Sequence, residues 1–146
     1  MLGLFHMAGI PILLEHHDDY FEIFNQHPTS GWVSIMENER EKYGTTHTTL
    51  SAFIANKWGL SAAQYESIYY IFDCDGIFDS TELNQESLYL LSALKIARQC
   101  VFRKNNIENH TEWAGVIESL ETFLKMDESD IEEIIDQAEQ QLNESI

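Results

Sequence analysis

The sequence is poor in several features that mark particular classes of protein. Its 146 residues include two cysteines, two prolines and only 8 Lys and Arg, against 25 Asp and Glu. Because Cys74 and Cys100 allow at most one bridge, a disulfide framework is excluded and a reducing compartment is the simpler expectation. The net charge of −17 argues against nucleic acid as a partner, since phosphate binding needs clustered cations. Anionic membrane surfaces are disfavoured for the same reason.

Long apolar runs are lacking as well. The longest one near the start, residues 7–14, is far shorter than the ~20 residues that a membrane-spanning helix needs. Residues 1–6 also lack the basic stretch that begins a signal peptide. We therefore expect a soluble, cytoplasmic protein that does not enter a membrane.

Apolar residues recur at helical spacing through most of the chain, as in Leu50, Phe53, Ile54 and Trp58. Alternation over the length of a strand does not occur. The sequence therefore predicts an all-α fold, a compact multi-helix bundle of about seven or eight helices that forms one domain over residues 1–146. The expected helices span residues 2–9, 11–26, 30–43, 46–58, 61–73, 84–104, 110–124 and 128–143.

Residues typical of helix ends agree with this periodicity. Gly44 and Gly59 are expected to end helices in the left-handed conformation. Pro11 is expected to break or kink the first helix, because proline cannot donate a backbone hydrogen bond. Three capping-box spacings predict helix starts: Ser61 with Gln64, Asn109 with Glu112, and Ser129 with Glu132.

Two polar runs could in principle hold a metal ion. The run His16, His17, Asp18 and Asp19 offers ligand types, but adjacent helical residues point about 100° apart, so a polar helix start is favoured. The second run resembles a calcium-binding EF-hand loop, with ligands Asp73, Asp75, Asp79 and Glu82 and with Gly76 at the turn. Its first position is Ile71, which has no side-chain oxygen, so a structural turn is favoured and no metal is expected.

No catalytic group is predicted from the residues themselves. Neither cysteine has a histidine at a spacing that suggests a dyad, and Cys100 falls on a helix that we expect to be mostly buried. The glycines are scattered singly, so no phosphate-binding loop is present. No cofactor is indicated.

Four segments together resemble the later part of the HDOD domain, the HD-related output domain of bacterial signalling proteins. Residues 3–10 are similar to its Leu-Leu-His-Asp-Ile-Gly type of segment, and residues 37–47 to its Glu-rich helix, Tyr-Gly turn and histidine. Residues 50–60 resemble its helix followed by Trp-Gly-Leu. The last helices, with Trp113 and residues 131–142, resemble its C-terminal end, so that the similarity runs over nearly the whole chain.

The resemblance implies that the hydrolytic metal site of the parent HD superfamily is degenerate here. His6 occupies the place of the dyad histidine, but Met7 replaces the dyad aspartate, and a thioether is a poor ligand for hard divalent ions. His47 remains as a possible ligand. The later His-His-Asp position reads Ile71, Phe72 and Asp73. We therefore predict no metal centre and no catalytic residue, with His6, Met7, His47 and Asp73 as vestigial positions.

The family resemblance also implies helices before residue 1 that this sequence does not contain. The apolar face of the first helices would then lack its cover, and exposed apolar patches mark interaction sites. We expect this face to be buried in a homodimer or by a protein partner. The resulting hypothesis is a non-catalytic bacterial signalling module that acts through protein contacts. The alternatives are a metal-dependent HD-type phosphohydrolase with a reduced site and an EF-hand-like calcium-binding protein.

Overall fold

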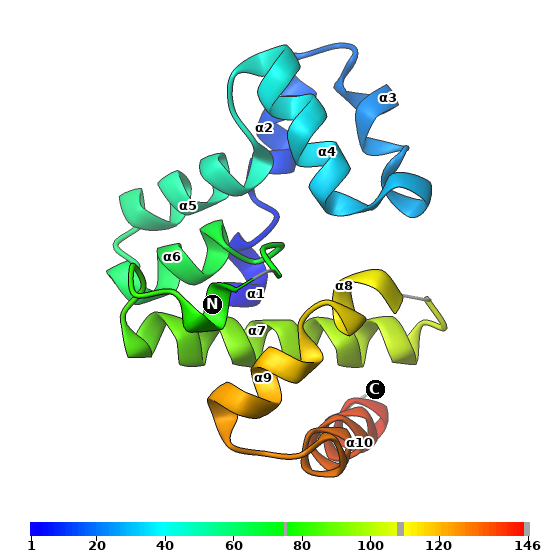
Figure 1. Ribbon diagram of the computed structural model, residues 1–146. Helices are drawn as coiled ribbons and strands as arrows, with labels where there is room; N and C mark the ends of the chain where they lie inside the picture. The colour runs from blue at the N-terminus through cyan, green and yellow to red at the C-terminus, as the bar shows by residue number, and fades with distance from the viewer. Residues whose placement is uncertain (75, 108–109, 145–146) are drawn as a thin grey trace. The chain divides into compact units, whose positions relative to one another are not determined.

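Helices are the only regular elements in the part of the chain that the structure describes (Figure 1). This computed structural model describes residues 1–74, 76–107 and 110–144, apart from the side chains of residues 27–30, 110 and 111. The prediction of an all-α fold is confirmed. The chain divides into two units, Met1–Asp73 and Cys74–Ile146, which are described in turn. The single domain over residues 1–146 stays a prediction.

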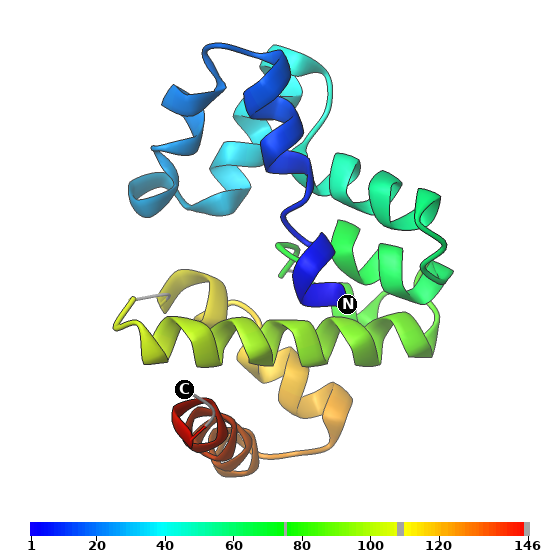
Figure 2. The same ribbon diagram turned by 180° about the vertical axis from the view of Figure 1, so that it is seen from behind.

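The first unit consists of six helices within its described residues. The helices α5 and α6 lie side by side, α2 packs on α5, and α3 packs on α4 (Figures 1 and 2). Helix α1 contacts both α5 and α6. The helices are α1 (Leu2–Phe5), α2 (Gly9–His16), α3 (Tyr20–Phe24), α4 (His27–Tyr43), α5 (His47–Lys57) and α6 (Ala62–Tyr69).

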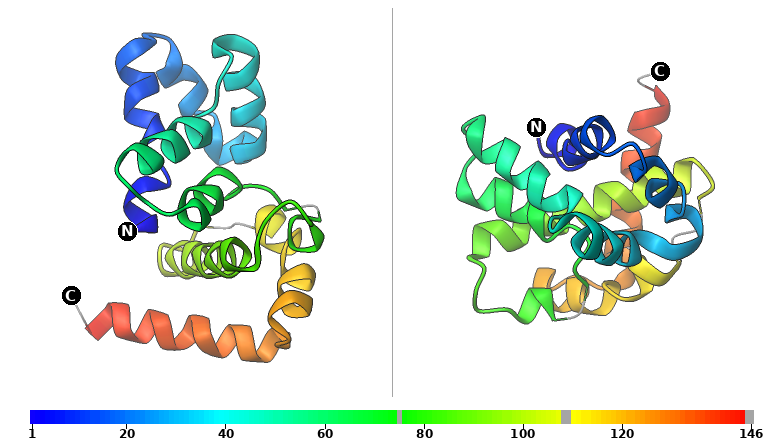
Figure 3. Two further views of the ribbon diagram at one scale, coloured as in Figure 1. Left: turned by 90° about the vertical axis from the view of Figure 1, so that its left-hand side faces the viewer. Right: turned by 90° about the horizontal axis from the view of Figure 1, so that it is seen from above.

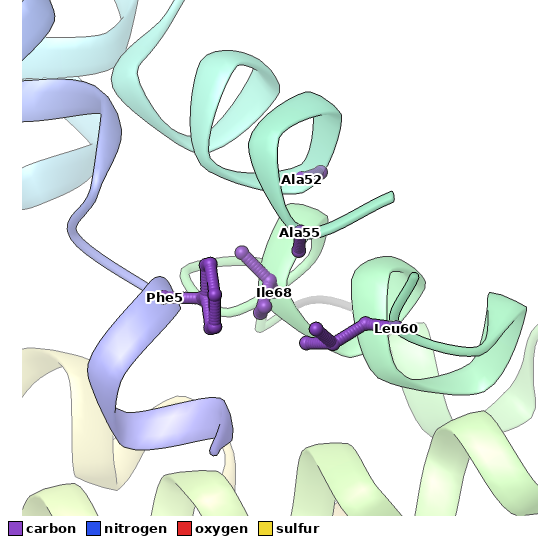
Figure 4. Close-up of a cluster of buried hydrophobic side chains, with 5 residues drawn as sticks. All are labelled: Phe5, Ala52, Ala55, Leu60 and Ile68. Atoms are coloured by element: carbon purple, nitrogen blue, oxygen red, sulfur yellow. The ribbon is translucent and has the colours of Figure 1, made fainter. Parts of the chain in front are cut away.

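Two apolar clusters hold these helices together. In the first, Phe5 of α1 points toward Ile68 of α6, next to two small residues of α5 (Figure 4). The second joins α2, α3 and α4 through Leu13, Ile23 and Ile35, and it includes Ile10. The first helices are therefore covered by their own unit at Phe5, Ile10 and Leu13, and the expectation of a bare apolar face is wrong there. Met1 and Leu4 remain exposed.

The second unit is built around one long helix. Helix α10 lies across α7: Figure 1 shows α7 lengthwise and α10 end-on, and the left view of Figure 3 shows the reverse. The core of the second unit includes four fully buried residues, Leu91, Leu120, Ile131 and Ile135. The elements are the 3₁₀ turn η1 (Ile77–Asp79), α7 (Gln85–Lys104), α8 (His110–Ala114), α9 (Ile117–Leu124) and α10 (Glu128–Glu144).

Most of the predicted helix ends are confirmed. Gly44 and Gly59 both adopt left-handed backbone conformations, and Leu60 N donates to Ala55 O at 3.0 Å. Ser61 and Gln64 form the predicted capping box. The helix break that was predicted around Pro11 lies before it, between α1 and α2. Pro11 is therefore in the first turn of α2, where a missing backbone N–H is tolerated.

Other boundaries differ from the prediction. The helix expected over residues 11–26 is two helices, because His17 is extended between α2 and α3. The helix expected over residues 110–124 is likewise split after Ala114. Helix α6 ends at Tyr69 instead of residue 73.

The predicted cap of the last helix is also misplaced. Asp127 and Asp130 exchange reciprocal bonds of 3.0 and 3.1 Å at the start of α10, in place of Ser129 and Glu132. The third predicted capping box involves Asn109, which lies outside the described residues.

The described residues contain no helix that is both long enough and apolar enough to cross a membrane.

Arg103 at the end of α7 connects three carboxylates of α10. Its guanidinium lies 2.5 Å from Glu132, 2.7 Å from Asp136 and 3.1 Å from Glu139. We expect Arg103→Ala to weaken the docking of α10 by about 1 kcal/mol, because a partly exposed network contributes modestly. Amide hydrogen exchange of α10 measures this change. The difference from wild type is expected to shrink in high salt.

Lys104→Ala is the matched control, since Lys104 reaches α10 through a long contact from its Nζ to Leu142 O at 3.4 Å. Its effect on exchange in α10 is expected to stay below about 0.5 kcal/mol. Equal effects of the two substitutions would contradict the role given to Arg103.

Candidate functional site

A buried carboxylate lies at the centre of the first unit. Glu39 of α4 accepts a hydrogen bond from the Tyr20 hydroxyl at 2.5 Å and one from the His47 backbone N at 2.8 Å. Its two oxygens also lie 2.9 Å from His47 Nδ1. All three side chains are fully buried. The carboxylate therefore joins α3, α4 and the first residue of α5.

The protonation of this cluster follows from its contacts. Burial, and then the hydrogen bond to Glu39, raise the pKa of the Tyr20 hydroxyl, so it stays protonated and donates. Because Nδ1 of His47 faces a carboxylate, it carries the proton that the carboxylate accepts. Nε2 of His47 is buried without a hydrogen-bond partner among the described residues. The imidazole is thus fixed on one side by Glu39.

Aromatic rings surround the imidazole of His47. Its ring centroid lies 5.1 Å from that of Trp32 and 5.5 Å from that of Phe72. Trp32 and Phe72 also stack on each other at 5.2 Å. Phe72 is one of the two apolar residues that stand where the HD superfamily is expected to have imidazoles. The side chains of Trp32 and Phe72 beside the His47 ring are therefore aromatic, and neither offers an oxygen or nitrogen lone pair to a metal ion.

The start of α2 approaches the same place very closely. Gly9 N donates to Ser51 Oγ at 2.8 Å. A Cβ atom at position 9 would lie 2.1 Å from the backbone oxygen of His47, so only glycine fits there. The contact fixes the segment that carries His6 and Met7 against the helix that begins at His47.

The four vestigial positions lie in different surroundings. His6 Nδ1 is 2.8 Å from Gly3 O, and Met7 packs against the apolar cluster of α2, α3 and α4. His47 is buried, and Asp73 is exposed after α6. Across the described residues, no three or more His, Cys, Asp and Glu side chains form a group that could hold a metal ion. The thioether of Met7 and the phenyl ring of Phe72 are not ligands for hard divalent ions, so these residues do not fit the metal centre that the resemblance implies.

The residues proposed for a calcium loop are divided between the two units. Asp73 ends the first unit, whereas Asp79 lies in η1 and Glu82 follows it in the second unit. Asp75 lies outside the described residues. Ile71, at the first loop position, is fully buried, as expected for an apolar core residue.

The polar run at residues 16–19 makes contacts within the protein. The ring of His17 stacks on Tyr43 with 4.1 Å between centroids. Asp19 pairs with Lys42 at 2.7 Å and accepts from the Tyr43 hydroxyl at 2.8 Å, and these hydrogen bonds lower the pKa of Asp19. The run thus connects the start of α3 to the end of α4.

Sequence reasoning missed Glu39 and Tyr20 as members of a site. A signal was present, because Glu39 lies four residues after Ile35 and four before Tyr43, on the apolar face of α4. A carboxylate on the apolar face of a helix is expected to be buried, and a buried carboxylate needs a hydrogen-bond partner inside the protein. The cysteines lie away from this cluster in sequence: Cys100 is buried, which raises the pKa of its thiol, and Cys74 is half-buried.

Comparison with known families assigns the first unit. A family model described as the HDOD domain matches residues 1–73. No curated protein and no solved structure matches the chain. The similarity of residues 74–146 to the C-terminal end of that domain stays a prediction.

Proposed function

The chain belongs to the HDOD domain family, and from this premise we propose that it is a non-catalytic regulatory module that acts through contacts with other proteins. The observation that carries the proposal is the environment of His47. Its Nδ1 pairs with Glu39, and Trp32 and Phe72 stand beside its ring. A hydrolytic two-metal centre would need oxygen or nitrogen ligands in that place.

The phosphohydrolase alternative is tested by metal analysis and an activity assay on the same preparation. We expect far less than one Mn, Fe or Zn ion per chain, and no hydrolysis of a cyclic dinucleotide when those metals are added. His47→Ala is the matched variant for any activity found. A stoichiometric metal with turnover that this variant abolishes would overturn the proposal.

The calcium alternative is tested by the melting temperature, because a ligand that binds the folded form must stabilise it. We expect no calcium-specific shift at millimolar calcium, with magnesium at the same concentration as the control.

A signalling role and a homodimer are parts of the same proposal. The exposed apolar residues Met1 and Leu4 at the start of the chain support a contact there. Sedimentation at micromolar concentration tests the dimer, and a well-folded monomer would contradict it.

A further inference from the structure

Helix α10 is held on the second unit by few buried side chains. Two of its residues, Ile131 and Ile135, are fully buried, and most of the others are exposed. Both buried residues lie in the first half of the helix. Leu142 follows on the same face in the second half, at helical spacing, and is exposed. The docking of α10 therefore depends on a short apolar contact.

The charge of α10 also favours an all-or-none docking. Residues 128–144 include seven Asp and Glu and no Lys, Arg or His. Acids three or four positions apart, such as Glu132, Asp136 and Glu139, repel one another on a helix and destabilise it when it stands alone. Arg103 of α7 pairs with all three. Away from α7 the helix loses this cation, so we expect docking and helix formation to be coupled in one cooperative unit.

The thiol of Cys100 lies on the face of α7 that α10 covers. Cys100 is three residues before Arg103, and residues at this spacing share one face of a helix. Helix α10 packs on α7, and Cys100 is only 3% exposed. Burial, and then the nearby charge of Glu139, raise the pKa of this thiol. The reactivity of Cys100 therefore reports whether α10 is in place.

Helix α9 closes its own end before α10 begins. Lys125 adopts the left-handed conformation, and Met126 N donates to Glu121 O at 3.1 Å. Asp127 then caps α10, where its carboxylate accepts from the backbone at 3.0 Å. The connection is thus a separate turn, and α10 can leave α7 without unwinding α9.

The other elements of the second unit also pack together without α10. Phe123 of α9 contacts Phe78 of η1, with 5.3 Å between ring centroids, and Tyr89 of α7, with 5.0 Å. Aromatic pairs of this kind stabilise the elements that they join. These contacts connect η1, α7 and α9 at a place that does not involve the last helix.

We propose that α10 is a releasable strap, which leaves α7 as one unit while α7 and α9 stay folded, and whose departure uncovers the face of α7 that carries Cys100. The strap is a conformational device that controls access to this face. It belongs to the second unit, so it is independent of whether the first unit is catalytic.

The test measures the labelling rate of Cys100 by a neutral maleimide in the full chain with Cys74→Ser, so that one thiol reports. We expect Cys100 to be at least about tenfold less protected than the slowest amides of α7, because local release needs less free energy than global unfolding. The rate is also expected to change little at low urea, since the release of one helix exposes little surface. Labelling with the urea dependence of global unfolding would overturn the inference.

Two variants at the end of α7 show whether the ion pairs hold the strap. Arg103→Ala is expected to speed the labelling of Cys100 about fivefold, because the three carboxylates lose their common partner. Lys104→Ala, the matched control, is expected to change the rate less than about twofold. The difference between the two variants should shrink in high salt. Equal rates for both would contradict the proposal.

Two adjacent isoleucines of α10 provide a second matched pair. Ile135→Ala removes a fully buried side chain and is expected to speed labelling by about 30-fold or more. Ile134 is 39% exposed, and Ile134→Ala is expected to change the rate less than about fivefold. Amide exchange maps which helices lose protection in Ile135→Ala. Loss of protection in α7 as well as in α10 would overturn the inference, because the strap would then not be separable from its unit.

Discussion

Replacing Glu39 by alanine is expected to lower the free energy of unfolding of the first unit by about 3–5 kcal/mol. The substitution leaves the Tyr20 hydroxyl, the His47 backbone N–H and the His47 ring N–H buried without their acceptor. Each unpaired buried donor costs about 1–3 kcal/mol, and local relaxation recovers part of the sum. Urea denaturation followed by tryptophan fluorescence measures the loss.

Two further variants show whether the carboxylate itself is responsible. Glu39→Gln keeps the size and one acceptor oxygen but adds a donor, so we expect an intermediate loss of about 2 kcal/mol. Glu41→Ala, at an exposed position of the same helix, is expected to change stability by less than about 0.5 kcal/mol. If Glu39→Ala and Glu41→Ala behaved alike, the buried cluster would have no special role in stability.

Gly9→Ala is expected to destabilise the first unit by about 3 kcal/mol, because the added Cβ overpacks a contact between two backbones. The new atom would lie 2.1 Å from the carbonyl oxygen of His47, which is not the movable end of a side chain. Helix α2 would have to move away from α5 and stretch the Gly9 to Ser51 hydrogen bond. Urea denaturation of the variant measures this effect.

Gly3→Ala is the matched control for the change from glycine to alanine. Nothing lies within 4 Å of a Cβ at position 3, which is in helix α1. Alanine is there expected to raise stability by about 0.5 kcal/mol. A Gly9→Ala protein as stable as wild type would show that α2 and α5 do not approach as described.

The sequence predicted local features far better than the long-range cluster. The turns at Gly44 and Gly59 and the capping box at Ser61 depend on residues close together in the chain, and all three are confirmed. At the start of α10 two pairs have the spacing of a capping box, Asp127 with Asp130 and Ser129 with Glu132. Spacing alone could not show that Asp127 is the residue that caps the helix. The cluster of Tyr20, Glu39 and His47 could not be predicted in this way, since it brings together residues from three helices.

The break at His17 shows a second limit. Apolar residues continue at helical spacing from Leu13 to Tyr20 and Ile23, and all three are buried, so the pattern alone indicates one helix. No glycine or proline stands between them to signal the change of direction. The backbone is extended at His17, yet α2 and α3 bury these residues in the same apolar cluster, so the apolar pattern does not record the break.

The contact between Gly9 and Ser51 has a consequence for synthesis on the ribosome. It joins residues 42 positions apart, so α1 and α2 cannot reach their final packing until α5 has been translated. At about 5–20 residues per second, the nascent chain spends on the order of several seconds with its first helices unpacked. During that interval Phe5 lacks its packing partners in α5 and α6, whereas Ile10 and Leu13 pack against α3 and α4. We therefore expect the segment around Phe5 to be the one that a nascent-chain chaperone binds first.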